Sequence, residues 1–252
     1  MINITYYLLI ALGINLLMFI PAFVLKTDKL TDMSYSLTFI ILTGIAFFLN
    51  SKTALKIILV LMILIWALRL GFFLIIRIRK MKRDKRFDDI RDHFTSFIKF
   101  WILQGIGAWL ILLPVIYFLG SKTERIFIIG FFIWTIGILI ESFADFQKYK
   151  FKQDPRNENK FIKKGLWKYS RHPNYFGEII CWIGIYVFVF PSLTLSQQII
   201  GLISPLTITF LLLFFTGIPP LEKYADKKWG NQPEYKKYKK RTSILVPLPR
   251  KK

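Results

Sequence analysis

The chain has 252 residues, of which 54% are hydrophobic, and it includes 25 Phe and 7 Trp. With a mean hydropathy of +0.45, this composition excludes an ordinary soluble domain and predicts an integral membrane protein. The net charge of +21 does not indicate nucleic-acid binding, because Lys and Arg lie between apolar stretches, where they meet anionic lipid headgroups. Membrane lipids are therefore the expected partners.

Seven stretches are long and apolar enough to cross a bilayer, which takes about 20 residues. The second is the weakest, because it is short and interrupted by Gly44. We predict an all-α integral membrane protein of about seven transmembrane helices, forming a single domain over 1–252. The predicted spans are 4–25, 34–50, 53–78, 97–119, 124–143, 174–191 and 195–219.

The distribution of basic residues predicts the topology. Most of the 36 Lys and Arg fall after the first, third and fifth spans and in the tail, whereas the opposite loops hold Lys52, Lys56, Lys122 and Arg125. Since basic loops stay cytoplasmic, the N-terminus should be outside and the C-terminus cytoplasmic. The N-terminus lacks a basic leader and a cleavage site, so its first apolar stretch is expected to be a retained helix.

The segments between spans differ in character. Residues 77–96 carry both charge signs and predict a solvated loop or short helix, while 144–172 interleaves aromatic with basic residues, as interfacial amphipathic segments do. Within the latter, Asp-Pro-Arg-Asn at 154–157 predicts a break. From Leu221 onward, Gly230 and several prolines exclude one continuous helix.

Five polar residues lie within or at the cytoplasmic edge of the predicted spans, where they are costly and usually face the protein interior. Glu141 and Asp145 share one helix face, as Asn174 and Glu178 do. We expect one polar chamber open to the cytoplasm. Alternatively, Arg69 forms a purely structural ion pair with Glu141 or Glu178. The five residues are Arg69, Glu141, Asp145, Asn174 and Glu178.

Arg171 and His172 precede a helix expected to begin at Pro173, and helix N-termini attract phosphate. We expect His172 to be exposed to the membrane interface, as a cap, a phosphate contact or a plain surface residue. Tyr238 and Arg241 belong to a basic, aromatic tail that either folds back beneath the chamber or binds headgroups.

Sequence signatures of soluble nucleotide-binding proteins are absent: there is no Gly-x-Gly-x-x-Gly after a strand, no Walker loop and no His-Glu-x-x-His. His93, His172 and the single cysteine, Cys181, do not predict a zinc site. The apolar setting of Cys181 predicts an inert buried thiol.

Three segments together resemble the steroid 5-alpha-reductase-like membrane proteins, in particular a bacterial branch without an assigned substrate. The resemblance covers about residues 53–252. It implies seven helices, NADPH bound at the cytoplasmic side of a bacterial inner membrane, and reduction of a carbon-carbon double bond conjugated to a carbonyl. The segments are 165–178 (Gly-Leu-Trp-Lys-Tyr-Ser-Arg-His-Pro-Asn-Tyr-Phe-Gly-Glu, followed by Trp182), 141–152 (Glu-Ser-Phe-Ala-Asp-Phe-Gln-Lys-Tyr-Lys-Phe-Lys) and 238–247 (Tyr-Lys-Lys-Arg-Thr-Ser-Ile-Leu-Val-Pro).

The resemblance also implies roles for individual residues. Asn174 and Glu178 match an Asn-x-x-x-Glu motif in which Asn contacts the cofactor and Glu belongs to the reaction centre. Asp145 and Tyr238 match cofactor-contacting residues, and Arg69 matches an Arg of the cofactor pocket. The predicted catalytic residues are Glu178, orienting or polarising the substrate oxygen, and Arg69, its partner. The predicted cofactor-binding residues are Asn174, Asp145, Glu141, Lys152, Arg171, His172, Tyr238 and Arg241.

The chain departs from the family pattern at three positions. Lys152 stands where the family has Arg, and Glu141 where it has Asn. Trp66 replaces the Tyr expected three residues before Arg69, and an indole cannot protonate a substrate oxygen. The predicted function is NADPH-dependent reduction of a lipophilic enone, steroid-like or isoprenoid, with the proton donor left open.

Two other functions compete with this prediction. Arg-His-Pro-x-Tyr at 171–175 and the tail also resemble isoprenylcysteine and phospholipid methyltransferases, which use S-adenosylmethionine, although only Glu222 of their Arg-x-x-Glu-Glu motif is present. A non-enzymatic lipid-binding or transport protein would more often show helices broken at mid-membrane.

Overall fold

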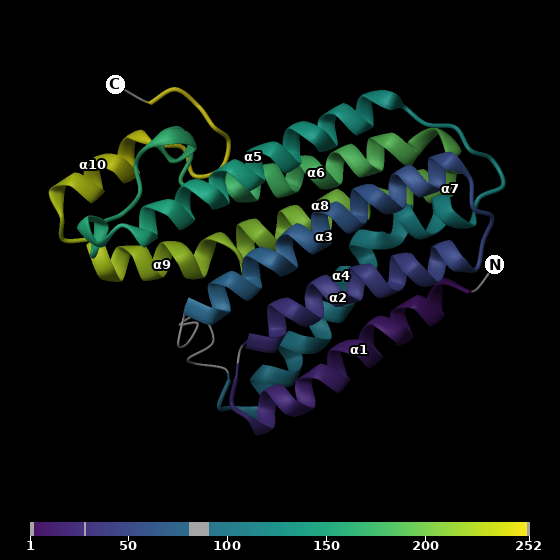
Figure 1. The fold of residues 1–252 in the computed structure, drawn as a ribbon, viewed down its shortest axis with the longest axis horizontal. Helices are drawn as coiled ribbons and strands as arrows, with labels where there is room; N and C mark the ends of the chain where they lie inside the picture. Colours follow the sequence, from purple (N-terminus) through teal and green to yellow (C-terminus); the bar gives the residue numbers. More distant parts are fainter. Residues whose placement is uncertain (1–2, 28, 81–90, 251–252) are drawn as a thin grey trace. The chain divides into compact units, whose positions relative to one another are not determined.

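A computed structural model describes residues 3–27, 29–80 and 91–250 (Figure 1). Over these ranges the chain is helical without a strand, apart from an isolated bridge between Ser170 and Ser243. It separates into two compact units, Met1–Ile126 with Val189–Thr207, and Phe127–Phe188 with Ile208–Lys252. The prediction of a single domain over 1–252 stays a prediction.

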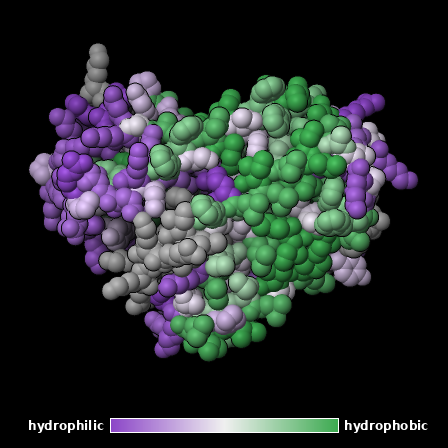
Figure 2. Space-filling model, viewed as in Figure 1, coloured by the Kyte–Doolittle hydropathy of each residue, from purple (hydrophilic) through white to green (hydrophobic). Residues whose placement is uncertain are grey.

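Helices long and apolar enough to cross a membrane number seven in the described ranges, which confirms the predicted all-α membrane fold. Many large apolar side chains are exposed, as Figure 2 shows for the visible face, and Leu17, Phe72 and Phe214 are each at least 67% exposed. Such surface belongs against lipid rather than water. The orientation of the termini stays a prediction. The seven segments are Ile4–Val24, Lys29–Phe48, Ala54–Phe72, Phe94–Gly120, Ile128–Gln153, Pro173–Ser192 and Leu195–Trp229.

In the first unit, α1 packs against α2 and α4, and α2 against α3. Phe19, Phe97 and Trp101 form an aromatic core between α1 and α4. Interhelical hydrogen bonds hold apolar helices together in lipid, and here Gln104 Nε2 donates to Asn15 Oδ1 at 2.9 Å. The helices of this unit are α1 (Ile4–Val24), α2 (Lys29–Phe48), α3 (Ala54–Lys80), α4 (Phe94–Gly120), α7 (Leu195–Gly201) and the first part of α8 (Ile203–Phe210).

Three predicted boundaries were wrong, and one of them is the end of the seventh span, which was predicted at 219 although the segment that begins at Leu195 continues to Trp229. The second span was predicted to begin at residue 34, but α2 begins at Lys29 and continues through Gly44. Its polar residues do not end the helix, because Thr31 and Ser34 are fully buried and hydrogen-bonded, the hydroxyl of Ser34 donating to the carbonyl of Thr31 at 2.8 Å. The fifth span was predicted to end at 143, whereas α5 (Ile128–Gln153) continues for ten further residues.

The second unit contains two long helices, a π-helical turn and two short amphipathic helices. Figure 1 shows α5 and α6 side by side. The helical elements of this unit are α5 (Ile128–Gln153), α6 (Pro173–Val189), the end of α8, η5 (Leu211–Phe215), α9 (Ile218–Trp229) and α10 (Pro233–Arg241), with the short 3-10 turns η2 (Pro155–Asn157) and η3 (Gly165–Lys168).

Predictions for the connecting segments are largely confirmed. The break at 154–157 is present, because α5 ends at Gln153 and the Asp154 carboxylate accepts the Arg156 N–H at 3.0 Å. The break in the tail is also present, since α9 and α10 are separated at Gly230. Residues 144–153 of the predicted interfacial segment instead belong to α5. Residues 81–90, half of the predicted loop at 77–96, lie outside the described residues, and at its two ends residues 77–80 belong to α3 and 94–96 to α4.

Candidate functional site

Glycines allow α5 and α6 to approach until their backbones touch. A Cβ added to Gly137 would lie 2.6 Å from the backbone N of Cys181, and one added to Gly177 would lie 2.6 Å from the backbone N of Glu141. Gly130 and Gly184 meet the facing helix in the same way. The pairing runs antiparallel, because positions later on α5 meet positions earlier on α6. These glycines therefore set the register of the two helices.

This register gathers four of the predicted site residues at one end of the helix pair. Glu141 lies against Gly177, the neighbour of Glu178, and the same spacing puts Asp145 level with Pro173, beside Asn174. Glu141, Asp145 and Glu178 are 2%, 8% and 8% exposed. Carboxyl groups so deeply buried on membrane helices commonly serve a function.

Arg69, the fifth residue of that predicted group, lies half-buried on α3 in the first unit. Trp66, one turn earlier, is fully buried, with its ring 5.0 Å from that of Phe39 and 6.4 Å from that of Tyr35. The indole thus belongs to the packing between α2 and α3. The predicted pairing of Arg69 with Glu178 stays a prediction.

Glu222 on α9 joins several basic groups, a role that sequence reasoning missed. Its carboxylate lies 2.5 Å from Nη1 of Arg171, 2.9 Å from Nε2 of His172 and 3.3 Å from Nζ of Lys239. The sequence offers one signal for this role, a carboxylate on an amphipathic helix of mixed charge, but it does not indicate the partners.

His172 is buried, 5% exposed, so the prediction that it faces the interface was wrong. Its ring stacks on Tyr175, with centroids 5.7 Å apart, and Nε2 is bound to Glu222. Burial lowers the pKa of the imidazole below its ordinary value, because desolvation outweighs the opposing effect of the Glu222 carboxylate.

Three polar atoms at the start of α6 are buried and have no hydrogen-bond partner among the described residues. They are Nε of Arg171, Nδ1 of His172 and Oδ1 of Asn174. Buried polar groups are nearly always satisfied, so unsatisfied atoms that lie close together indicate a missing ligand or water. In neutral His172 the Nε2–H donates to the Glu222 carboxylate, so Nδ1 is an acceptor. One of the three atoms therefore donates and two accept, which suits a ligand that carries phosphate and amide or hydroxyl groups.

The tail lies along the segment that leads into α6. The hydroxyl of Tyr238 donates to the carbonyl of Trp167 at 2.8 Å, and burial raises the pKa of this phenol, so it remains a donor. The N–H of Arg171 donates to the carbonyl of Ser243 at 2.8 Å. The other two predicted residues, Lys152 at the end of α5 and Arg241 at the end of α10, are exposed.

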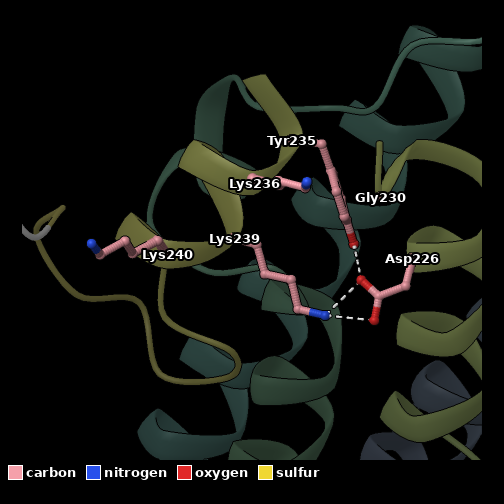
Figure 3. Close-up of a pocket in the computed structure, with 6 residues that line it drawn as sticks. All are labelled: Asp226, Gly230, Tyr235, Lys236, Lys239 and Lys240. Atoms are coloured by element: carbon pink, nitrogen blue, oxygen red, sulfur yellow. Dashed lines mark hydrogen bonds and ion pairs between the residues drawn. The ribbon is translucent and has the colours of Figure 1, made fainter. Parts of the chain in front are cut away.

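A pocket of about 470 Å³ lies between α9 and α10 (Figure 3). Its Asp226 carboxylate accepts from Nζ of Lys239 at 2.6 and 2.7 Å and from the Tyr235 hydroxyl at 3.2 Å. Since Lys239 also reaches Glu222, this pocket is connected to the ion-pair cluster. The lining residues are Asp226, Gly230, Tyr235, Lys236, Lys239 and Lys240.

No group of three or more His, Cys, Asp or Glu side chains in the described parts of the chain is arranged to hold a metal ion. Cys181 is fully buried, which confirms the prediction of a buried thiol.

Together, the apolar helices and the buried polar residues at the α5–α6 seam define an integral membrane protein with a candidate ligand site in its second unit. The chain belongs to the family described as "Protein of unknown function (DUF1295)", which matches residues 18–242.

The chain is also similar to 3-oxo-5-alpha-steroid 4-dehydrogenase 1 of Mus musculus, with 26% identity over 126 residues. The match covers 50% of this chain and 44% of the mouse protein, so the chain matches less than half of that relative's length. No solved structure matches. The two matches support the resemblance to the steroid 5-alpha-reductase-like proteins and indicate a reductase-like family of membrane proteins.

Proposed function

We propose that the chain is a membrane-embedded NADPH-dependent reductase of a carbon-carbon double bond in a lipophilic enone, steroid-like or isoprenoid. The observation that carries the proposal is the set of buried, unsatisfied atoms of Arg171, His172 and Asn174 beside the carboxyl groups of Asp145 and Glu178. The similarity to a protein named as a steroid 4-dehydrogenase supports it.

The residues present fit such a cofactor. The Arg171 guanidinium keeps an unsatisfied N–H after its contact with Glu222, so it remains able to bind phosphate. Asn174 and Asp145 would hold polar groups of the cofactor, and His172 and Glu141 would line its site. Exposed Lys152 and Arg241 would add positive charge at the entrance, while Tyr238 would support the segment before α6. When bound, NADPH supplies the hydride.

Glu178 would act on the substrate. As a carboxylic acid it would donate a hydrogen bond from its O–H to the carbonyl oxygen of the enone, which draws electron density away from the double bond. Trp66 is fully buried in the first unit and its N–H is not acidic, so it is not the proton source. Arg69 keeps its predicted catalytic role. An apolar substrate would enter from the bilayer, and Glu178 would hydrogen-bond to its polar end.

A methyltransferase is the second candidate, and one observation favours it. Glu222, which is retained from the methyltransferase-like motif, contacts both Arg171 and His172 of the Arg-His-Pro segment. S-adenosylmethionine, whose sulfonium is cationic, would then be the ligand.

Ligand titration separates these functions. The purified full-length protein would be titrated with NADPH and, separately, with S-adenosylmethionine while its thermal unfolding is followed. A ligand at 100 times its Kd stabilises the folded state by about 2.7 kcal/mol. We expect stabilisation by NADPH, reduced in Asn174→Ala and unchanged in the exposed control Lys237→Ala. Stabilisation by S-adenosylmethionine alone would overturn the proposal, and a response to neither would indicate a non-enzymatic protein.

Turnover tests the role of Glu178. The probes are a Δ4-3-ketosteroid and an isoprenoid enone in lipid nanodiscs, with NADPH oxidation as the readout. Glu178→Gln should lower turnover far more than NADPH affinity, whereas Arg69→Ala tests the predicted role of that residue independently. If Glu178→Gln leaves both turnover and NADPH affinity intact, the assignment fails.

We further propose that the site faces the cytoplasm of a bacterial inner membrane. The variant Arg241→Cys tests this orientation, because a membrane-impermeant thiol reagent added to intact cells should not label a cysteine on the cytoplasmic side.

A further inference from the structure

The final segment of the described chain, Ser243–Arg250, is held against the residues that precede α6; we name it the tail strap. The hydroxyl of Ser170 donates to the carbonyl of Leu245 at 2.6 Å, and the N–H of Leu248 donates to the carbonyl of Tyr169 at 3.2 Å. Nε of Arg250 donates to the carbonyl of Lys168 at 3.2 Å. The strap therefore has a fixed inner face.

Exposure alternates along the strap. Ile244, Val246 and Leu248 are 43%, 44% and 50% exposed, while Ser243 and Leu245, whose carbonyls are bound, are less accessible. Three branched apolar side chains thus form an outward ridge, which we name the apolar ridge. Neighbouring exposed apolar side chains of this kind usually mark a surface that is covered in the working protein.

The level of the strap along α5 indicates what covers it. The indole N–H of Trp167 donates to the carbonyl of Ala144 at 3.0 Å, and the N–H of Leu166 donates to Oε1 of Gln147 at 2.9 Å. α5 begins at Ile128. Since a hydrocarbon core of about 30 Å takes about 20 residues at about 1.5 Å each, a span that starts there leaves the core near Gln147.

Side chains near this level agree with a membrane boundary. Near the end of α5, the apolar residues Phe143 and Phe146 are 57% and 54% exposed, and the exposed Lys150 follows them. Tyr169, next to the strap, is 39% exposed. Aromatic and basic residues in this order are typical of the headgroup region.

Charge also matches lipid. Arg250, the last residue of the strap, and Lys168 beside it are exposed, and exposed Lys240 and Arg241 end the helix before it. A ridge of apolar side chains bordered by Lys and Arg is the composition that binds the interface of anionic membranes. A soluble partner would not need to match the depth at which the strap lies.

We propose that the apolar ridge inserts into the boundary between headgroups and acyl chains of the membrane that the protein spans. The strap is then an interfacial anchor, distinct from the spanning helices. Because Ser243 also accepts the N–H of Arg171, lipid contact would help to fix the segment that begins α6. The proposal does not depend on which reaction the protein catalyses.

Site-directed fluorescence tests the anchor. Full-length Val246→Cys would be labelled with an environment-sensitive fluorophore and placed in nanodiscs containing phosphatidylglycerol. The native Cys181 is fully buried, so wild-type protein gives the labelling background. Lys237→Cys, exposed on α10, is the matched control. Quenching is measured with a nitroxide on the lipid acyl chain and with iodide in the water.

The label at 246 should be quenched several-fold more by the acyl nitroxide than the label at 237, and less by iodide. Equal access of iodide to both labels would overturn the proposal. Protection of 246 from both quenchers, with a dependence on the number of protein copies per disc, would also overturn it, in favour of a second copy. If Val246→Cys does not fold, Leu248→Cys gives the same comparison.

Discussion

Replacing Gly177 with Ala tests the packing that brings the candidate site together. The new Cβ would lie 2.6 Å from the backbone N of Glu141, 2.7 Å from the carbonyl O of Gly137 and 2.8 Å from the Cβ of Glu141. None of these atoms is the end of a flexible side chain, so a rotamer change cannot relieve the overlap. α5 and α6 must move apart next to Glu141 and Glu178.

The size of the effect follows from the overlap. Carbon atoms in ordinary contact are about 3.5–4.0 Å apart, so each contact falls short by roughly 1 Å. Overpacking of this kind costs typically about 1–3 kcal/mol, against an intrinsic helix gain of about 0.8–1.0 kcal/mol for Gly to Ala. Because all three contacts are to atoms that cannot move aside, we expect the upper end of this range, so the free energy of unfolding should fall by about 2 kcal/mol, together with a loss of NADPH affinity.

Denaturant unfolding of the purified protein in mixed micelles measures the change. Gly44→Ala is the matched control, because a Cβ at Gly44 has nothing within 4 Å, so this variant should lose no stability and gain up to about 1 kcal/mol. Should Gly177→Ala prove as stable as Gly44→Ala, the backbone contact between α5 and α6 is absent and the assembly of the site described above is refuted.

Three further predictions concern the tail and its ion pairs. Glu222→Ala should cost about 1–3 kcal/mol in denaturant unfolding, because it leaves the Arg171 guanidinium, 12% exposed, without its carboxylate partner. Glu234→Gln, in an exposed pair with Lys163, should cause no measurable change, and equal effects of the two variants would contradict the central role of Glu222. Since burial lowers the pKa of His172 below 6.5, the folded state binds fewer protons than the unfolded state. Thermal stability should therefore fall as the pH drops from about 7.5 to about 5.5. His172→Gln should weaken this pH dependence, and a variant with the same pH dependence as the wild type would show that His172 is not its cause. Tyr238→Phe removes the donor to Trp167 and should cost about 0.5–1.5 kcal/mol, which the same unfolding measurement detects; a neutral result would mean that the hydroxyl is bound to water instead.

The sequence alone determined the class of protein and most of the helices. A bilayer requires long apolar helices whose backbone groups are satisfied internally, and this requirement is visible as hydropathy along the chain. The break at 154–157 was also predictable, because turn residues act over a few positions of the chain. The same holds for the helix faces that Glu141 shares with Asp145 and Asn174 with Glu178, because helical periodicity relates residues four positions apart.

Only the tertiary structure decided how these elements meet. Nothing local marks Gly137 and Gly177 as the seam of α5 and α6, since a glycine in an apolar helix has no visible partner. The burial of His172 depends on Glu222, fifty residues away in sequence, and the fixed position of the tail depends on backbone carbonyls that carry no sequence signal. Hydropathy and periodicity describe what each segment can bury, but the close approach of distant segments selects which polar groups are satisfied and which remain for a ligand.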